Sequence, residues 1–73
     1  MRIIYELAVQ FDDKENTNYF SYDRELLTLK VAQIIIANPK SIITSASRYN
    51  QEDYIRDVNK VAPWEWSDSI WIK

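Results

Sequence analysis

The chain has 73 residues, with nine Lys and Arg against eleven Asp and Glu, and it contains no His, Cys or Gly. The lack of Cys and His excludes a disulfide framework, a zinc finger, a thiol nucleophile and a Ser-His-Asp triad. The lack of Gly excludes the glycine-dependent phosphate loops and the EF-hand turn. The composition therefore does not identify the function directly, but it narrows the class of function.

A chain of this length allows one domain, residues 1–73, which buries only about 60% of its unfolded surface. Its apolar fraction of 47% is too high for a disordered chain. The longest unbroken apolar run, Ile34 to Ala37, is too short to span a membrane, and Glu6 interrupts the N-terminal apolar segment before a signal-peptide core could form. We therefore expect a cytoplasmic globular protein without a membrane segment.

The first elements predict a β-hairpin. Residues 2–11 alternate, which is typical of a strand with one buried face. The residues expected on that face are Ile3, Tyr5, Leu7, Val9 and Phe11. Residues 12–18 are all polar and predict the hairpin loop, and residues 19–22 predict a short aromatic strand that pairs with the first.

A helix should follow, with Asp23 as its N-cap. Leu26 and Ile36 widen an apolar stripe at helical spacing, and Pro39 predicts that the helix ends near Ala37. The central positions of the stripe are Leu27, Val31, Ile34 and Ile35.

Residues 41–47 predict a third, partly exposed strand. One face should carry Ile42, Thr44 and Ala46, and the other Ile43, Ser45 and Ser47.

Asn50 resembles an N-cap, with Asp53 at the third helical position. Tyr54, Val58 and Val61 recur at helical spacing and favour a short second helix that ends before Pro63, although a strand at 54–58 is an alternative for so short a segment. We expect a turn at 67–69 and a terminal strand at 70–73. The fold class is therefore α+β: a small antiparallel or mixed sheet packed on one main helix.

The acidic residues favour structural roles over a metal site. Asp12, Asp13 and Glu15 are best explained as a solvated hairpin tip. A second acidic group, Glu52, Asp53 and Asp57, suits the first turn of a helix. We expect no cofactor, no metal and no enzymatic activity, because the possible nucleophiles show no activating neighbour and a chain this small has little room for a pocket. A catalyst or metal binder remains the third class of function.

A nucleic-acid signal is confined to aromatic residues near Lys14 and Arg24, and acidic residues flank the same segment. A small regulatory module on nucleic acid is therefore the alternative function. Its candidate cations are Arg2, Lys14, Arg24, Lys30 and Lys40.

The tryptophans favour contact with another protein, because all three lie in the last ten residues and one helix can hardly bury them all. Which of them are core residues and which are interface residues stays open. The candidate partner-binding residues are Trp64, Trp66 and Trp71, together with the exposed members of Tyr19, Tyr22, Tyr49 and Tyr54. No proline blocks a predicted strand edge, so a homodimer is a further option.

Three segments, at residues 2–10, 19–21 and 41–44, give the chain its order of elements. This order resembles that of many very small proteins of phages and mobile elements, including some anti-CRISPR proteins. The resemblance covers most of the chain, contains no diagnostic motif and transfers no functional residue. It implies an inhibitor that occupies a site on a large host complex. The leading hypothesis is thus a non-enzymatic protein-interaction module.

Overall fold

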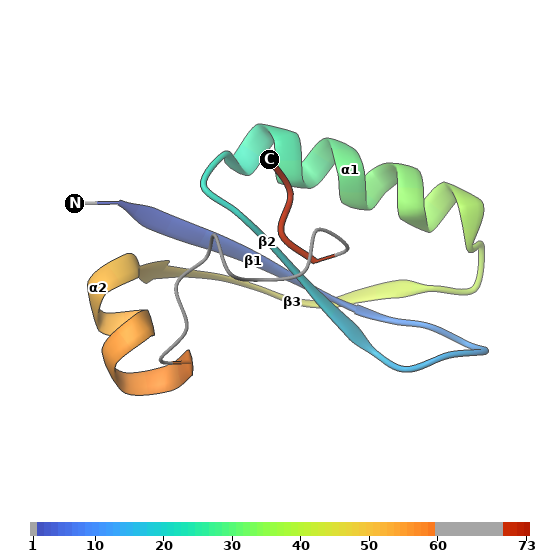
Figure 1. The fold of residues 1–73 in the computed structure, drawn as a ribbon. Coiled ribbons are helices and arrows are strands. Elements are labelled where there is room, and N and C mark those ends of the chain that lie inside the picture. The colour runs from blue at the N-terminus through green and yellow to red at the C-terminus, as the bar shows by residue number, and fades with distance from the viewer. Residues whose placement is uncertain (1, 60–69) are drawn as a thin grey trace.

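The computed structural model describes residues 2–59 and 70–73. Three strands form an antiparallel sheet in the order β2-β1-β3, and α1 crosses one face of it (Figure 1). A short α2, continued by a π-helical turn η1, follows β3. The expected α+β fold is thereby confirmed. The bounds are β1 Ile3–Gln10, β2 Thr17–Ser21, α1 Arg24–Ala37, β3 Ile42–Asn50, α2 Gln51–Tyr54 and η1 Ile55–Asn59.

The helix α1 begins and ends where its sequence predicts. The Asp23 carboxylate accepts a hydrogen bond from the Leu26 amide at 3.1 Å and so caps the first turn. At the other end, the Asn38 side-chain amide donates to the Ile34 carbonyl oxygen at 2.8 Å. The following Pro39 cannot continue the helix, so α1 ends at Ala37.

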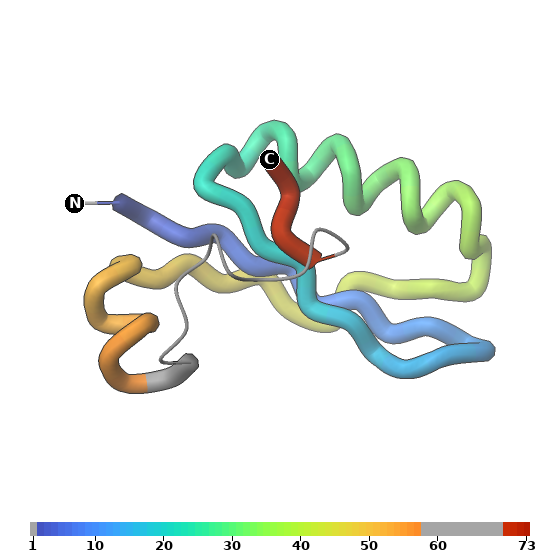
Figure 2. The backbone as a smooth tube through the Cα atoms, viewed as in Figure 1, coloured from blue at the N-terminus to red at the C-terminus, as the bar shows by residue number. Residues whose placement is uncertain are grey.

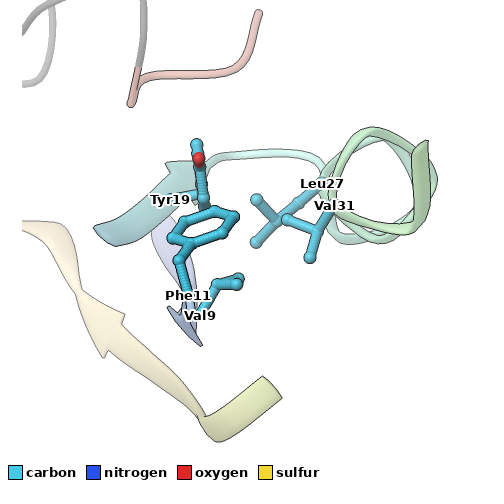
Figure 3. Packing of buried hydrophobic residues seen from close by; sticks show 5 residues of the cluster. All are labelled: Val9, Phe11, Tyr19, Leu27 and Val31. Atoms are coloured by element: carbon cyan, nitrogen blue, oxygen red, sulfur yellow. The ribbon is translucent and has the colours of Figure 1, made fainter. Parts of the chain in front are cut away.

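The buried stripe of α1 packs on the β1–β2 hairpin. Leu27 and Val31 point from α1 toward Tyr19, Phe11 and Val9 (Figure 3). Ile34 and Ile35 pack against this cluster as expected. The prediction that Ile36 widens the stripe is wrong, because Ile36 is 79% exposed. It follows Leu27 by nine positions, about two and a half helical turns, and so lies on the outer side of α1.

The prediction of a single buried face on β1 is also wrong. Ile4 and Glu6, which belong to the face turned away from α1, are among the buried residues. The second face of β1, the central strand, is covered as well. An aromatic cluster from β2, α2 and the C-terminal segment packs on it. Its buried members are Ile4, Phe20, Tyr54 and Trp71, with Tyr22 and Tyr49 packed against them.

The strand β3 is longer than predicted, and its register shifts. Ser45 lies opposite Ala8, but Ile43 lies opposite Val9, so that Thr44 is an extra residue in β3. This β-bulge reverses the alternation beyond it. Ile43 therefore shares the face of Ala46, which corrects the predicted assignment of faces.

The C-terminal segment pairs with the outer edge of β2. Phe20 donates its amide hydrogen to the Ile70 carbonyl oxygen at 2.8 Å, and its own carbonyl oxygen accepts from the Ile72 amide at 2.7 Å. The expected terminal strand is thus reduced to one parallel bridge between Phe20 and Trp71. Figure 2 shows this segment, in red, beside β2 and near the first half of α1. The predicted turn at 67–69 lies outside the described residues.

The chain after β3 is helical, so the alternative of a strand at 54–58 is wrong. The Asn50 side-chain oxygen accepts from the amides of Glu52 at 2.9 Å and Asp53 at 3.3 Å, which confirms the predicted N-cap. The helix widens into a π-helical turn from Ile55 onward. Val61 and Pro63, on which its predicted end rested, lie outside the described residues.

Two leucines of α1 test this packing. Leu27→Ala should lower the free energy of unfolding by about 2–5 kcal/mol, because it removes a fully buried side chain from the core. The matched control is Leu29→Ala, on the same helix but 56% exposed, which should change stability by about 0.5 kcal/mol or less. Urea unfolding followed by circular dichroism measures both. Equal losses in the two variants would contradict the described orientation of α1.

Candidate interaction surface

Most of the described aromatic residues that we expected at a partner interface pack within the chain. Tyr19 is buried against α1, and Tyr54 and Trp71 are buried on the opposite face of the sheet. Tyr22 and Tyr49 are half-buried. Tyr19 and Tyr54 are therefore not among the exposed tyrosines of this folded chain. The predicted anchors Trp64 and Trp66 lie outside the described residues.

The aromatic rings on the face away from α1 hold α2 and the C-terminal segment against the sheet. The rings of Tyr49 and Tyr54 have centroids 4.7 Å apart, and those of Phe20 and Tyr54 are 6.0 Å apart. Tyr22 and Trp71 make an edge-to-face contact at 4.7 Å. Such pairs stabilise a fold by about 0.5–1.5 kcal/mol beyond their buried area. This cluster therefore stabilises the chain from within.

Tyr22 also ties the start of β1 to α2. The Arg2 guanidinium lies 4.3 Å from the centre of the Tyr22 ring, and the Tyr22 hydroxyl donates to the Gln51 side-chain oxygen. The Gln51 amide in turn donates to the Arg2 carbonyl oxygen at 2.9 Å. Arg2, one of the candidate cations for nucleic acid, is thus part of a structural contact.

Glu6 is a buried carboxylate at the centre of the sheet, only 8% exposed. Its two oxygens accept hydrogen bonds from the Tyr49 hydroxyl at 2.9 Å and from the Asn18 side-chain amide at 3.1 Å. Burial and the neighbouring Glu6 carboxylate raise the pKa of Tyr49 above its ordinary value. Nothing in the alternation of β1 distinguished Glu6 from an exposed residue, so sequence reasoning missed this network.

The acidic residues take the structural roles that we expected. Asp12, at the hairpin tip, pairs with Lys40 at 3.8 Å. In the helical turn, Arg56 contacts Asp53 and Asp57 at 2.9 Å each, and this guanidinium lowers the pKa of the Asp57 carboxyl. Within residues 2–59 and 70–73, no three metal-ligating side chains gather at one point.

The candidate cations for nucleic acid do not form one surface. Lys14 lies over the Phe11 ring at 4.2 Å, and Lys40 is paired at the hairpin tip. Lys30 and Arg24 are both exposed on α1. Arg24 lines a shallow groove together with Arg48. Arg48 was not among the cations that the sequence singled out.

Three exposed isoleucines of the described chain lie near the connection from α1 to β3, and Leu29 of α1 is exposed as well. Ile36 near the end of α1 is 79% exposed, and Ile42 and Ile43 at the start of β3 are 56% and 48% exposed. The strand lies at the edge of the sheet, with α1 placed over β1 and β2 (Figure 1). We call these three isoleucines the α1–β3 patch; Ile43 lies on the α1 side of the sheet and Ile42 on the opposite side, so a partner that covers both wraps around the start of β3. The sequence placed Ile36 in the apolar stripe of the helix and Ile42 and Ile43 in a partly exposed strand. It therefore did not predict that all three would be exposed.

Comparison with protein-family models, with curated proteins and with solved structures finds no match to this chain. Across the described residues, none of the helices has the length and apolar character needed to cross a bilayer. The function is therefore inferred from the chain's own residues.

The Glu6 network generates a prediction about stability. Tyr49→Phe keeps the ring against Tyr54 but removes one donor to the buried Glu6 carboxylate, so the free energy of unfolding at neutral pH should fall by about 1–3 kcal/mol. Tyr5→Phe, at a half-buried tyrosine of the other face, is the control. Urea unfolding measures the difference. An unchanged midpoint in Tyr49→Phe would show that the bond adds nothing to stability.

The raised pKa of Tyr49 predicts a loss of stability in alkali. In the unfolded chain the phenol ionises near its ordinary pKa of 10.0, whereas in the folded chain it stays neutral to a higher pH. Its contribution is therefore fully present below the ordinary pKa and is lost as the pH rises through the raised one. The wild type should lose more stability than Tyr49→Phe as the pH rises above the ordinary pKa of 10.0. Parallel pH dependences in the two proteins would contradict this prediction.

Proposed function

We propose that this chain is a cytoplasmic, non-enzymatic protein-interaction module that inhibits a large host complex by occupying a site on it. This is the mode of action implied by its resemblance to small phage and mobile-element proteins, including those that inhibit CRISPR or other host defences. The observation that carries the proposal is the α1–β3 patch. Exposed apolar side chains beside an uncovered strand are typical of a surface that another protein covers.

The packing of the described tyrosines and Trp71 supports this surface over an aromatic one. Tyr19, Tyr54 and Trp71 are needed to cover the two faces of the thin sheet, so they cannot also enter a partner without opening the core. The three isoleucines are not needed in that way, because they are about half exposed or more in the folded chain. Their burial in a complex would remove apolar area from water at no cost to the fold.

The alternative, a regulatory module on nucleic acid, has less support. A phosphate backbone is usually bound by a row of lysines and arginines on one surface. Here Arg2, Lys14 and Lys40 contact Tyr22, Phe11 and Asp12, and the chain carries a net charge of −2. A salt titration separates the two functions, because binding to phosphates weakens steeply with salt and an apolar contact hardly responds.

Affinity capture from the native host, followed by mass spectrometry, tests the proposal. The wild type should retain one host complex with and without nuclease treatment. Ile36→Glu and Ile42→Glu should each weaken this capture about tenfold or more, because a buried carboxylate replaces an apolar contact. Neither variant should lower the melting temperature, since both side chains are exposed.

The matched control is Gln33→Glu, which introduces the same negative charge at an exposed polar position of α1. It should leave capture unchanged. Capture that disappears on nuclease treatment favours the nucleic-acid alternative. Capture that all three variants retain contradicts the assignment of the α1–β3 patch.

A further inference from the structure

One edge of the sheet has no partner strand among the described residues. The outer edge of β2 pairs with residues 70–72, but within the described chain only β1 pairs with the nine-residue β3. Such an edge presents a row of amide and carbonyl groups to solvent. It is therefore the place where the sheet can accept another extended segment.

The hydrogen bonds of β1 and β3 identify which groups point outward. The Gln51 amide donates to the Arg2 carbonyl oxygen, which marks these residues as a hydrogen-bonded pair in line with the β1–β3 register. Since bonded and non-bonded pairs alternate along an antiparallel ladder, the pairs of Arg48 with Tyr5 and of Ala46 with Leu7 are non-bonded ones. The amide and carbonyl groups of Ala46 and Arg48 therefore face away from β1.

A groove follows this edge on the side of α1. Two adjoining hollows of about 390 Å³ and about 220 Å³ share Tyr5, Arg24, Ala46 and Ser47 among their lining residues. The larger extends along α1 to Thr28, and the smaller reaches Arg48.

The groove carries positive charge that the fold does not use. Arg24 and Arg48 are exposed and form no ion pair within the described part of the chain. Glu6 also lines the larger hollow, but its carboxylate accepts hydrogen bonds from Asn18 and Tyr49, which place it toward the other face of the sheet. In a chain with a net charge of −2, these two arginines make the groove locally positive.

We propose that the outer edge of β3 binds an extended acidic segment of the partner protein as an added strand. The segment's main chain bonds to the outward groups of Ala46 and Arg48, and a carboxylate of its α1-facing side chains contacts Arg24 and Arg48. Strand addition of this kind obtains affinity from the main chain and specificity from alternate side chains. This inference rests on the proposed function and names the chemistry of its partner.

A second copy of the chain fits this edge less well. The register that uses Ala46 and Arg48 of both copies would place two Arg48 side chains and two Arg24 side chains on one face of the joined sheet. Like charges so close together oppose pairing. Charge complementarity thus favours an acidic segment over self-association.

The probe is a short synthetic peptide that alternates valine and glutamate, compared with the same peptide carrying glutamine for glutamate. In amide NMR spectra, the glutamate peptide should shift the Ala46 and Arg48 signals, and the glutamine peptide should bind about tenfold more weakly or worse. Arg24→Gln and Arg48→Gln should each weaken binding of the glutamate peptide about fivefold. Neither loss should exceed the one caused by replacing glutamate with glutamine in the peptide.

Ala46→Pro separates strand addition from simple charge attraction. Proline removes an amide hydrogen that faces away from β1, so the sheet keeps its own ladder while the added strand loses a bond. Binding should fall to the level of the glutamine peptide or below. Ala46→Thr, which keeps the amide hydrogen and favours a strand, is the matched control and should bind normally. Amide spectra that match the wild type elsewhere verify that both variants are folded.

Several results would overturn this inference. Equal binding of the two peptides, or no binding of the glutamate peptide at millimolar concentration, would contradict the role of the carboxylate. Dimerisation of the chain through β3 without peptide would identify a second copy as the occupant. Displacement of the peptide by an oligonucleotide would identify nucleic acid as the occupant. Host capture that survives Ala46→Pro but is lost in Ile42→Glu would leave the interaction module standing and remove the strand addition. Capture retained in both variants would remove the strand addition and the assignment of the α1–β3 patch, whereas a wild type that captures no host complex would remove the proposed function itself.

Discussion

The structure depends on the position of β1 at the centre of the sheet. This strand carries both hydrogen-bonded ladders, to β2 and to β3, and both of its faces are covered. Leu27 and Val31 of α1 pack on the hairpin from one side, and an aromatic cluster packs on the other. A domain this small buries a limited share of its surface, so it gains stability by using both faces of one strand.

The residues that cover the two faces of β1 are not available for contact with a partner. The rings of Tyr54 and Trp71 close the second face, and the C-terminal segment also pairs with the edge of β2. No comparable element covers β3 among the described residues, so Ile42, Ile43 and the outward groups of Ala46 are exposed. The edge at β2 is thus paired within the chain, and the edge at β3 is the one at which we propose that a partner binds.

Local signals predicted the elements well, because each depends on a few neighbouring residues. Asp23 and Asn50 cap the two helices through their own side chains, and the residue after Asn38 is a proline that stops α1. The candidate site was predicted less well. Aromatic residues mark both cores and interfaces, and a sequence does not tell which face of a strand will be covered.

The sequence by itself determined the α+β class, the hairpin, the main helix with its cap and its end, and the absence of chemistry that requires His, Cys or Gly. Only the tertiary structure decided that Glu6 is buried, that Ile36 is exposed and that a bulge at Thr44 turns Ile43 toward the face of α1. The reason is physical. Capping and periodicity act over a few residues, whereas burial and register depend on contacts between segments far apart in the chain.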